Sequence, residues 1–516
     1  MNSPGPSLAT TLVRNALYGS GARIITLAVG LVITPYLIHR LGMERFGIWA
    51  LVGVVTGALG LLDFSFKNAF VKHLAEAVAT GKRQTESRIL STGLASYLVF
   101  SVMIVALFLA LADAMLALLN IPVPLRPEAL TVFWIGVAGF LISSVMAIFP
   151  AVCDARQRMD ITNSLGVAAL VIGAVLTVIA VEAGYGLIGL AGAQLAGIVL
   201  FHLLCILAAR RLAGPLQIRP EHICRECFRR LFAFSWRLHI SSICMIINRQ
   251  LDKLILARWA GLTVVSAYEV AFKAVANMGT LQPYLAAALL PASSQISAAG
   301  DHARLLSLYR RATRYLFLVG TPPFIFLALE SQTLITAWLG TPHAMAAMII
   351  ICLVPGYLIN ALSNAMAFVC QGVGQPGIQA RQSALQLLLN IILSLGLFHL
   401  IGPLGAPIGT SIALAVGAFY FARWFHRFLG MGTWSLLRDA ALLPLVGSLA
   451  GALCAWLVSG HMPAEGRPDA MLRLLVSGSV FTSVYLLSAV ISGQLGRAEL
   501  VLLRSALGGL QGRASS

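Results

Sequence analysis

The sequence predicts an all-α polytopic membrane protein with about 14 transmembrane helices. Of its 516 residues, 59% are hydrophobic and 11% are charged, and the mean hydropathy is +0.87. Average soluble domains carry about 25% charged residues, so a soluble enzyme does not fit this composition. Apolar runs of about 20 residues, each long enough to cross a hydrocarbon core of about 30 Å as a helix, follow one another along the chain. Helices are expected because backbone polar groups in lipid must be satisfied within their own segment.

The apolar windows mark the expected spans in order. The first follows a short polar N-terminus without a small-residue cleavage site, so it is expected to be retained as a span rather than removed as a signal peptide. Gly402 and Pro403 predict a tight outer turn between two late windows. The windows are 16–38, 46–68, 90–112, 129–151, 163–182, 186–209, 232–257, 262–290, 315–338, 344–369, 380–401, 403–422, 440–459 and 471–493.

The positions of Lys and Arg predict the orientation. With a cytoplasmic N-terminus and alternating spans, 24 of the 36 basic residues fall in inner segments, 6 in outer segments and 6 within spans. Such an excess on one side is typical of cytoplasmic loops. We therefore expect a multi-pass protein of the inner (cytoplasmic) membrane with both termini in the cytoplasm. The formal charge of +17 is then explained by topology and by anionic lipid, and not by nucleic-acid binding.

The sequence contains no motif that predicts catalysis, and the chain is not expected to be an enzyme. It has no P-loop, HExxH or GxSxG motif, and its loops are too short for a soluble catalytic domain. Cys224 and Cys227 form a CxxC pair with only His222 nearby, whereas a structural zinc site needs four ligands. Neither a metal site nor a cofactor is expected.

An internal repeat divides the chain into two similar halves. Two pairs of glycines are related by one and the same shift along the sequence: Gly42 with Gly261, and Gly81 with Gly300. Six predicted spans separate the copies, so both halves have the same orientation. Parallel repeats of this kind are related by an axis along the membrane normal, with a substrate site at their interface.

The repeat predicts four segments. Two are pseudo-symmetric six-helix lobes, and the most basic stretch of the chain is the expected linker between them. A helix pair follows the second lobe. The predicted boundaries are 1–212 for the N-terminal lobe, 213–229 for the cytoplasmic inter-lobe loop, 230–425 for the C-terminal lobe, and 426–516 for two additional spans and a cytoplasmic tail.

Ionisable residues within the predicted spans are the candidate functional residues. Placing an ionisable side chain at membrane depth costs several kcal/mol of free energy, so such residues usually face a cavity or a partner. Some lie one helical turn from an opposite charge, such as Glu269 and Lys273. Two non-functional explanations also account for such residues: they pair within one helix, or they extend their charged ends to the membrane interface. Arg23 and Arg237 have no acidic partner in their helices and begin the two lobes. The basic residues are Arg23, Lys67, Arg237, Arg249, Lys253 and Lys273, and the acidic ones are Asp63, Asp252, Glu269 and Glu330.

Two segments resemble a known family. The segment YGSGARIITLAVGLVITPYLIHRLGMERFGIWALVGVVTGALGLLDFSFKNAFVKHLAEA resembles the N-terminal signature of Wzx-type polysaccharide and oligosaccharide flippases. These belong to the multidrug/oligosaccharidyl-lipid/polysaccharide (MOP) exporter superfamily. The segment NRQLDKLILARWAGLTVVSAYEVAFKAVA also resembles the family, with Asp252, Tyr268 and Glu269 in the expected pattern. The resemblance covers roughly 16–425; Phe64 and Ser65 depart from it, because the family usually has glycine after the position of Asp63.

The resemblance implies a MATE-like fold and a transport function. Similar proteins move polyprenyl-pyrophosphate-linked oligosaccharide, a precursor of surface polysaccharide, from the inner to the outer leaflet by alternating access. It implies that Arg23 and Arg237 bind phosphate, a role that suits guanidinium groups. Further implied cationic groups are Lys67, Arg249, Lys253 and Lys273, with Asp63, Asp252 and Glu269 holding them or carrying a coupling proton. The expected partners are the lipid-linked substrate, membrane lipids and proteins of polysaccharide polymerisation and assembly.

Three alternatives remain open. A multidrug antiporter of the same superfamily should have a buried carboxylate in its first span, where this chain has Arg23 and no acid. A lipid II flippase is a closer rival. A non-transporting scaffold for polysaccharide assembly has no use for arginines without partners inside the membrane.

Overall fold

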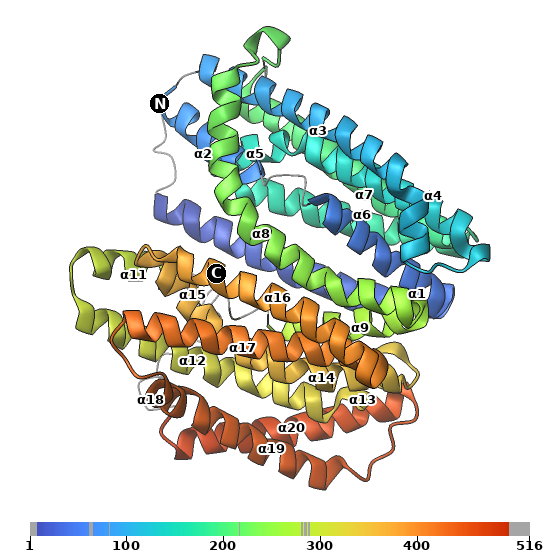
Figure 1. Cartoon of the computed structure of the whole chain (residues 1–516), viewed down its shortest axis with the longest axis vertical. Helices are drawn as coiled ribbons and strands as arrows, with labels where there is room; N and C mark the ends of the chain where they lie inside the picture. The colour runs from blue at the N-terminus through green and yellow to red at the C-terminus, as the bar shows by residue number, and fades with distance from the viewer. Residues whose placement is uncertain are drawn as a thin grey trace, which may run out of the picture. The chain divides into compact units, whose positions relative to one another are not determined.

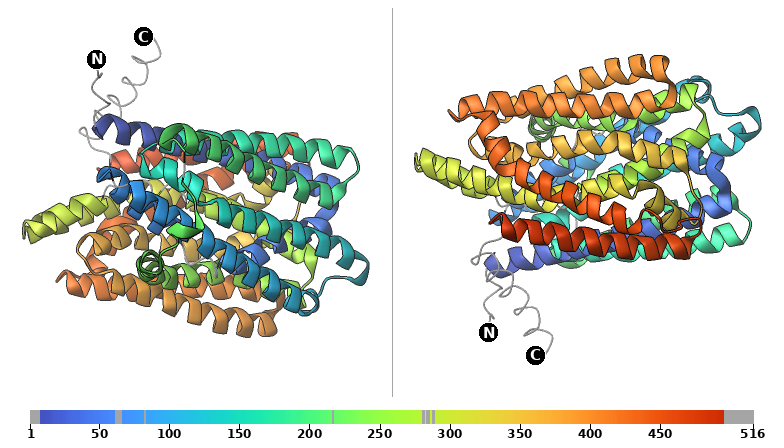
Figure 2. Two further views of the ribbon diagram at one scale, coloured as in Figure 1. Left: turned by 90° about the horizontal axis from the view of Figure 1, so that it is seen from above. Right: turned by 90° about the horizontal axis from the view of Figure 1, so that it is seen from below.

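The described part of the protein is built from helices. The computed structural model describes residues 8–60, 66–81, 83–215, 217–279, 282, 286 and 289–494, and no strand occurs among them. The chain separates into two compact units, Met1–Glu269 (unit 1) and Val270–Ser516 (unit 2). Figure 1 labels the helices, and Figure 2 shows that the long helices within each unit run roughly parallel to one another.

Ten helical stretches in the described residues are long and apolar enough to cross a membrane. Two of them, Tyr18–Gly57 and Pro376–Phe428, each cover two predicted windows. The window 232–257 lies in α8 (Arg225–Trp259), in which charged residues interrupt the apolar sequence. The window 262–290 begins with α9 (Leu262–Met278), which is 17 residues long. The prediction of an all-α polytopic membrane protein is therefore confirmed.

Helix α1 (Leu8–Gly60) contains the first predicted span, 16–38, and the described beginning of the second, 46–60. Gly42 interrupts it with φ 81° and ψ 165°, a conformation that glycine adopts without the steric cost of a Cβ atom. The equivalent residue of the repeat, Gly261, has φ 87° and joins α8 to α9. The same glycine turn therefore separates two antiparallel spans in both copies.

The helices repeat with the same spacing as the glycines. The shift that relates Gly42 to Gly261 also relates Arg83, the first residue of α3 (Arg83–Leu118), to His302, the first residue of α12 (His302–Leu329). It relates the first residue of α7 (Gly186–Ala213) to that of α17 (Gly405–Phe428) as well. Gly81 and Gly300, which precede α3 and α12, have φ values of 66° and 71°. The predicted pseudo-symmetry is thus present in the backbone itself.

Unit 1 is held together by α1 to α8. One core cluster joins α2, α3, α5 and the start of α8, and the fully buried Phe70 ring belongs to it. Gly93 of α3 lies directly under this ring, so that a Cβ atom there would overlap it. The remaining helices of the unit are α2 (Phe66–Ala79), α4 (Arg126–Met146), α5 (Ile148–Ala155) and α6 (Met159–Glu182).

Unit 2 contains a buried row of polar side chains on α16. Gln386 donates to Oδ1 of Asn360 at 2.9 Å. Asn390 Oδ1 accepts from the hydroxyls of Ser394 at 2.6 Å and Thr410 at 2.9 Å. These bonds connect α16 to its neighbours. The helices of the unit are α11 (Leu289–Ala298), α12, α13 (Ser331–Leu339), α14 (Ala344–Asn360), α15 (Leu362–Gly372), α16 (Pro376–Ile401), α17, α18 (Thr433–Leu437), α19 (Leu443–Ser459) and α20 (Arg467–Ile491).

The last two helices, α19 and α20, pack on α12 and α13 within unit 2 (Figure 1). Glu330 is 1% exposed and lies 3.2 Å from Nε of Arg473 on α20. At another point of the same contact, the Tyr485 hydroxyl donates to the carbonyl of Leu318 at 2.6 Å. The predicted intramembrane acid Glu330 therefore has its counter-ion on the terminal helix pair.

Candidate functional site

In unit 1, ion pairs connect the predicted inner segments with one another at one end and the predicted outer segments with one another at the other end. At one end, Arg14 and Arg158 contact Asp160 and Arg156 contacts Glu86 at 2.5 Å. At the other, Arg40 lies 2.8 Å from Glu182 and Arg45 lies 3.0 Å from Glu128. We refer to these as the inner and the outer end, following the predicted topology. The contacts agree with the predicted alternation of spans, and which end faces the cytoplasm stays a prediction.

The basic loop before α8 also lies at the inner end. The backbone N–H groups of Arg219 and Cys224 donate to the hydroxyls of Ser91 and Thr92 on α3, each at 3.0 Å. The pKa of the Cys224 thiol is lowered, first of all by the backbone N–H of Cys227. Burial raises the pKa of the Cys227 thiol to about 11. The two cysteines of the CxxC pair are therefore chemically different.

The α8–α9 hairpin brings four of the residues singled out by the sequence together. Lys253 Nζ lies 2.9 Å from Glu269 Oε2, and their side chains are 6% and 14% exposed. The hydroxyl of Tyr268 donates to Asp252 Oδ2 at 2.6 Å, and both residues are buried. The turn at Gly261 produces both contacts by folding α9 back along α8. A buried ammonium group without a counter-ion costs several kcal/mol, which explains why Lys253 and Glu269 occur as a pair.

The hairpin is fixed against the second half of α1. The Ser266 hydroxyl donates to the carbonyl of Met43, and Gly47 lies so close to the Leu262 carbonyl that a Cβ atom there would overlap it. The turns at Gly42 and Gly261 therefore lie at the same, outer end of unit 1. Trp49 lies two helical turns beyond Gly42, which is about 10 Å along the helix.

Two adjoining cavities lie between the helices of unit 1. One, of about 350 Å³, has a mainly apolar lining with polar side chains from several helices, and we call it the Trp49 cavity. The other, of about 490 Å³, reaches the buried His202 and is called the His202 cavity. Phe140, Ser143, Gln194 and Ile198 line both. The polar residues and tryptophan around the Trp49 cavity are Trp49, Thr56, Ser143, Gln194, Lys253 and Glu269.

The other predicted site residues lie elsewhere or are not described. Arg23 is exposed on α1 and Arg249 is exposed on α8, while Lys273 is half-buried on the part of α9 that belongs to unit 2. Asp63 and the side chains of Lys67 and Arg237 lie outside the described residues. The predicted cationic cluster around Arg23 and Arg237 therefore stays a prediction.

Sequence reasoning missed the uncharged part of the site. Gln194 and His202 are the only amide and imidazole groups in the otherwise apolar window 186–209, and polar groups at membrane depth usually face a cavity or a partner. This signal could have identified both. Trp49 and Ser143 carried no such signal, because tryptophan and serine are common in membrane helices.

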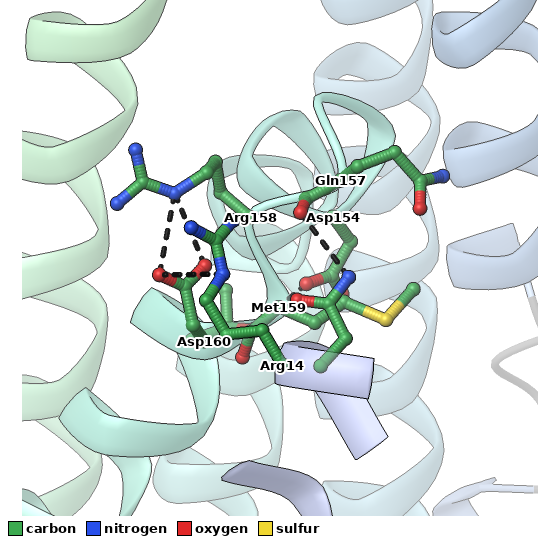
Figure 3. Close-up of polar contacts among 8 residues, drawn as sticks. Arg14, Asp154, Gln157, Arg158, Met159 and Asp160 are labelled. Atoms are coloured by element: carbon green, nitrogen blue, oxygen red, sulfur yellow. Dashed lines mark hydrogen bonds and ion pairs between the residues drawn. The ribbon is translucent and has the colours of Figure 1, made fainter. Parts of the chain in front are cut away.

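A third polar cluster lies at the inner end (Figure 3), where α1 meets the turn between α5 and α6. The side-chain amide of Asn15 donates to the carbonyl of Gln157 at 3.2 Å. Gln157 has φ 59°, a left-handed conformation that is uncommon for residues other than glycine. Arg14 precedes Asn15 in the sequence and Arg158 follows Gln157, and both arginines contact Asp160.

The fold matches solved transporters. The structure of a lipid II flippase, MurJ, in an inward closed conformation has a TM-score of 0.74 and 15% identity, and the match covers 93% of this chain and 100% of that one. An inward-facing multidrug resistance MATE family transporter of the MOP superfamily has a TM-score of 0.63 and 16% identity, with 81% and 96% covered. The predicted MATE-like fold is confirmed.

Sequence relatives have names connected with cell-surface glycans. A "Putative O-antigen transporter" of Shigella flexneri is 20% identical over 81% of this chain and 98% of its own length. A "Probable low-salt glycan biosynthesis flippase Agl15" of Haloferax volcanii is 24% identical over 39% of this chain and 43% of its own length. The resemblance to polysaccharide flippases is thereby confirmed.

A family model described as "Polysaccharide biosynthesis protein" matches residues 40–348, which is more than half of the chain. The matched region contains the α8–α9 hairpin and every residue that lines the two cavities. The chain belongs to the polysaccharide biosynthesis protein family of membrane transporters.

Proposed function

We propose that this protein flips a polyprenyl-pyrophosphate-linked oligosaccharide from the inner to the outer leaflet by alternating access. The observation that carries the proposal is the Trp49 cavity, which holds an ion pair, an amide and hydroxyl groups among membrane-spanning helices. A saccharide is rich in hydroxyl groups and needs such partners when it leaves water. The names of the relatives support the same substrate class.

The charge balance of the cavity favours a saccharide over a phosphate at this point. Lys253 is neutralised by Glu269, so the pair offers both a donor and an acceptor and brings no net charge. The aromatic ring of Trp49 adds an apolar face beside these polar groups. We assign the uncharged part of the headgroup to the Trp49 cavity.

The pyrophosphate is assigned to the cationic residues outside this cavity. In the proposal, Arg23 and Arg237 bind it in the inward state, and Arg249 and Lys273 in the outward state, with Lys67 as a further basic group. Asp63, Asp252 and Glu269 hold cations or carry a coupling proton. An Arg237→Ala variant that leaves export and protein level unchanged would remove this assignment.

The proposed location is the inner membrane of a bacterium, with both termini in the cytoplasm. The excess of Lys and Arg in the predicted inner segments supports this orientation. Enzymes that polymerise or assemble the exported saccharide are the proposed protein partners, because the flipped lipid is their substrate.

The direct test is a lipid extract from a strain that lacks the gene, analysed by mass spectrometry. We expect polyprenyl-pyrophosphate-linked oligosaccharide to accumulate, a surface polymer to be lost, and both changes to be reversed by the wild-type gene. Accumulation of lipid II would instead assign the chain to peptidoglycan synthesis. Unchanged lipids with altered sensitivity to cationic drugs would favour an antiporter.

A further inference from the structure

Two arginines from distant segments converge on one carboxylate at the inner end of unit 1. Arg158 Nε lies 3.1 Å from Oδ1 and 3.3 Å from Oδ2 of Asp160, and Arg14 Nε lies 3.7 Å from Oδ2. Arg14 belongs to α1, whereas Arg158 precedes α6. The three residues, which we call the inner-end cluster, carry a formal charge of +1.

The surrounding contacts fix this geometry and engage the neighbouring charges. The link from Asn15 to the Gln157 carbonyl holds α1 against the turn that carries Arg158. Asp154 accepts from the Thr162 hydroxyl at 2.8 Å, and Arg156 is paired with Glu86. Among the residues drawn in Figure 3, Asp160 is the carboxylate that both Arg14 and Arg158 contact.

The arginines remain accessible in this arrangement. The side chains of Arg14 and Arg158 are 34% and 38% exposed, whereas that of Asp160 is 12% exposed. Figure 3 shows the terminal nitrogens of Arg158 pointing away from Asp160. A guanidinium group has five N–H donors; Arg158 donates to Asp160 through Nε, whereas Nε of Arg14, at 3.7 Å, is close enough for an ion pair but not for a hydrogen bond.

We propose that Arg14 and Arg158 form a docking site for the phosphate or pyrophosphate group of a membrane lipid, in which Asp160 occupies the place of the anion until a lipid arrives. A dianion balances both arginines, whereas one carboxylate balances only one. Phosphate oxygens also accept from two guanidinium groups at once, which is a preferred geometry for arginine. The inference rests on the proposed function for the nature of the lipid, a polyprenyl pyrophosphate.

The site shares no residue with the Trp49 cavity or with the group of residues assigned above to the pyrophosphate in transit. It links α1 to α6 at the inner end, while Arg40 and Glu182 link the same two helices at the outer end. An anion that binds both arginines replaces the Arg14–Asp160 contact at the inner end and leaves the Arg40–Glu182 contact at the outer end in place. The headgroup would therefore contact the first helix before it reaches the cavity.

The test measures the affinity of the full-length protein in detergent for inorganic pyrophosphate, from the shift of its thermal unfolding. We expect Arg14→Gln and Arg158→Gln to weaken binding by about tenfold or more. Asp160→Asn should strengthen it several-fold, because it removes the competing carboxylate. Arg40→Gln, which removes the matched arginine at the outer end, should leave the affinity unchanged.

The Asp160 variant separates this proposal from a purely structural role. If the cluster only holds α1 to α6, Asp160→Asn and Arg14→Gln destabilise the protein alike, because each breaks the Arg14–Asp160 link, and neither increases pyrophosphate binding; that result overturns the proposal. Unfolding without pyrophosphate reports whether each variant is folded. Arg158→Lys keeps the positive charge but loses the planar guanidinium group that can donate two hydrogen bonds in parallel, so this variant should bind pyrophosphate with intermediate affinity.

A second arm identifies the source of the phosphate. Native mass spectrometry of the protein in nanodiscs of phosphatidylcholine, with or without phosphatidic acid, counts the retained lipid. We expect more phosphatidic acid on Asp160→Asn and less on Arg158→Gln. Binding of pyrophosphate without retention of phosphatidic acid would overturn the assignment to a lipid. These measurements do not depend on the deletion strain, so the proposed function and the docking site can fail separately.

Discussion

The two units differ at equivalent positions of the repeat. Ala169, Gly173 and Thr177 are the buried residues of α6, and the shift that relates Met159, the first residue of α6, to Pro376, the first residue of α16, places them on three buried residues of α16: Gln386, Asn390 and Ser394. This shift is two residues shorter than the one that relates Gly42 to Gly261. In unit 1, Ala169 and Gly173 line the His202 cavity. In unit 2, the longer polar side chains at these positions are hydrogen-bonded to neighbouring helices.

The difference shows how a duplicated scaffold can acquire two roles. The backbone of both copies keeps the same helix starts and glycine turns. Small residues on one face of α6 leave room for a ligand, whereas amide side chains on the same face of α16 fill the space and connect the helices. We therefore propose that this face of α6 contacts the ligand and that the same face of α16 has a supporting role.

The largest expected effect comes from breaking the ion pair of unit 1. Glu269→Ala leaves the buried ammonium of Lys253 without its counter-ion, and removal of one partner of a buried pair costs about 3–5 kcal/mol. The free energy of unfolding in detergent measures this loss. The double variant with Lys253→Met should recover most of the stability but not the export of polysaccharide. Recovery of both would show that the pair is only structural.

A smaller loss of stability is expected from the polar row of unit 2. Asn390→Leu removes the acceptor of the Ser394 and Thr410 hydroxyls, which should cost about 1–3 kcal/mol. Export should fall only as far as the amount of folded protein falls. A variant that is stable but inactive would contradict the supporting role of unit 2.

Filling the cavity of unit 1 should affect function more than stability. Ala169→Leu places a larger apolar side chain into the His202 cavity, so export should fall about tenfold, equivalent to about 1.4 kcal/mol, with the unfolding temperature kept or raised. Ala168→Leu on the exposed side of α6 is the matched control. Equal export by both variants would exclude the His202 cavity from the transport path.

The smallest effect concerns the cysteines at the inner end. Because the pKa of Cys224 is lowered and that of Cys227 is raised to about 11, Cys224 has the larger thiolate fraction near neutral pH and should react first with a membrane-impermeant maleimide. Raising the pH towards the pKa of Cys227 should narrow the difference. Labelling in inside-out vesicles, and not in intact cells, would place the inner ends of unit 1 in the cytoplasm.

The spans, the repeat and the end of unit 1 at which each loop lies were predictable from the sequence. They depend on hydrophobicity, glycine turns and charge, respectively. It also indicated that acids hold the buried cations. It placed Glu269 one turn from Lys273 but could not show its contact with Lys253, because that contact depends on the angle of the Gly261 turn. The cavities were not predictable, since their volume is set by the packing of small residues against several other helices.

The buried contact between Glu330 and Arg473 has an evolutionary consequence. A chain that lost α19 and α20 would leave the Glu330 carboxylate without its counter-ion inside unit 2, at a cost of about 3–5 kcal/mol. Deletion of the helix pair is therefore selected against until an uncharged residue replaces Glu330. A single ion pair therefore makes loss of the two terminal helices difficult, and shorter relatives that lack them should have a neutral residue at the position of Glu330.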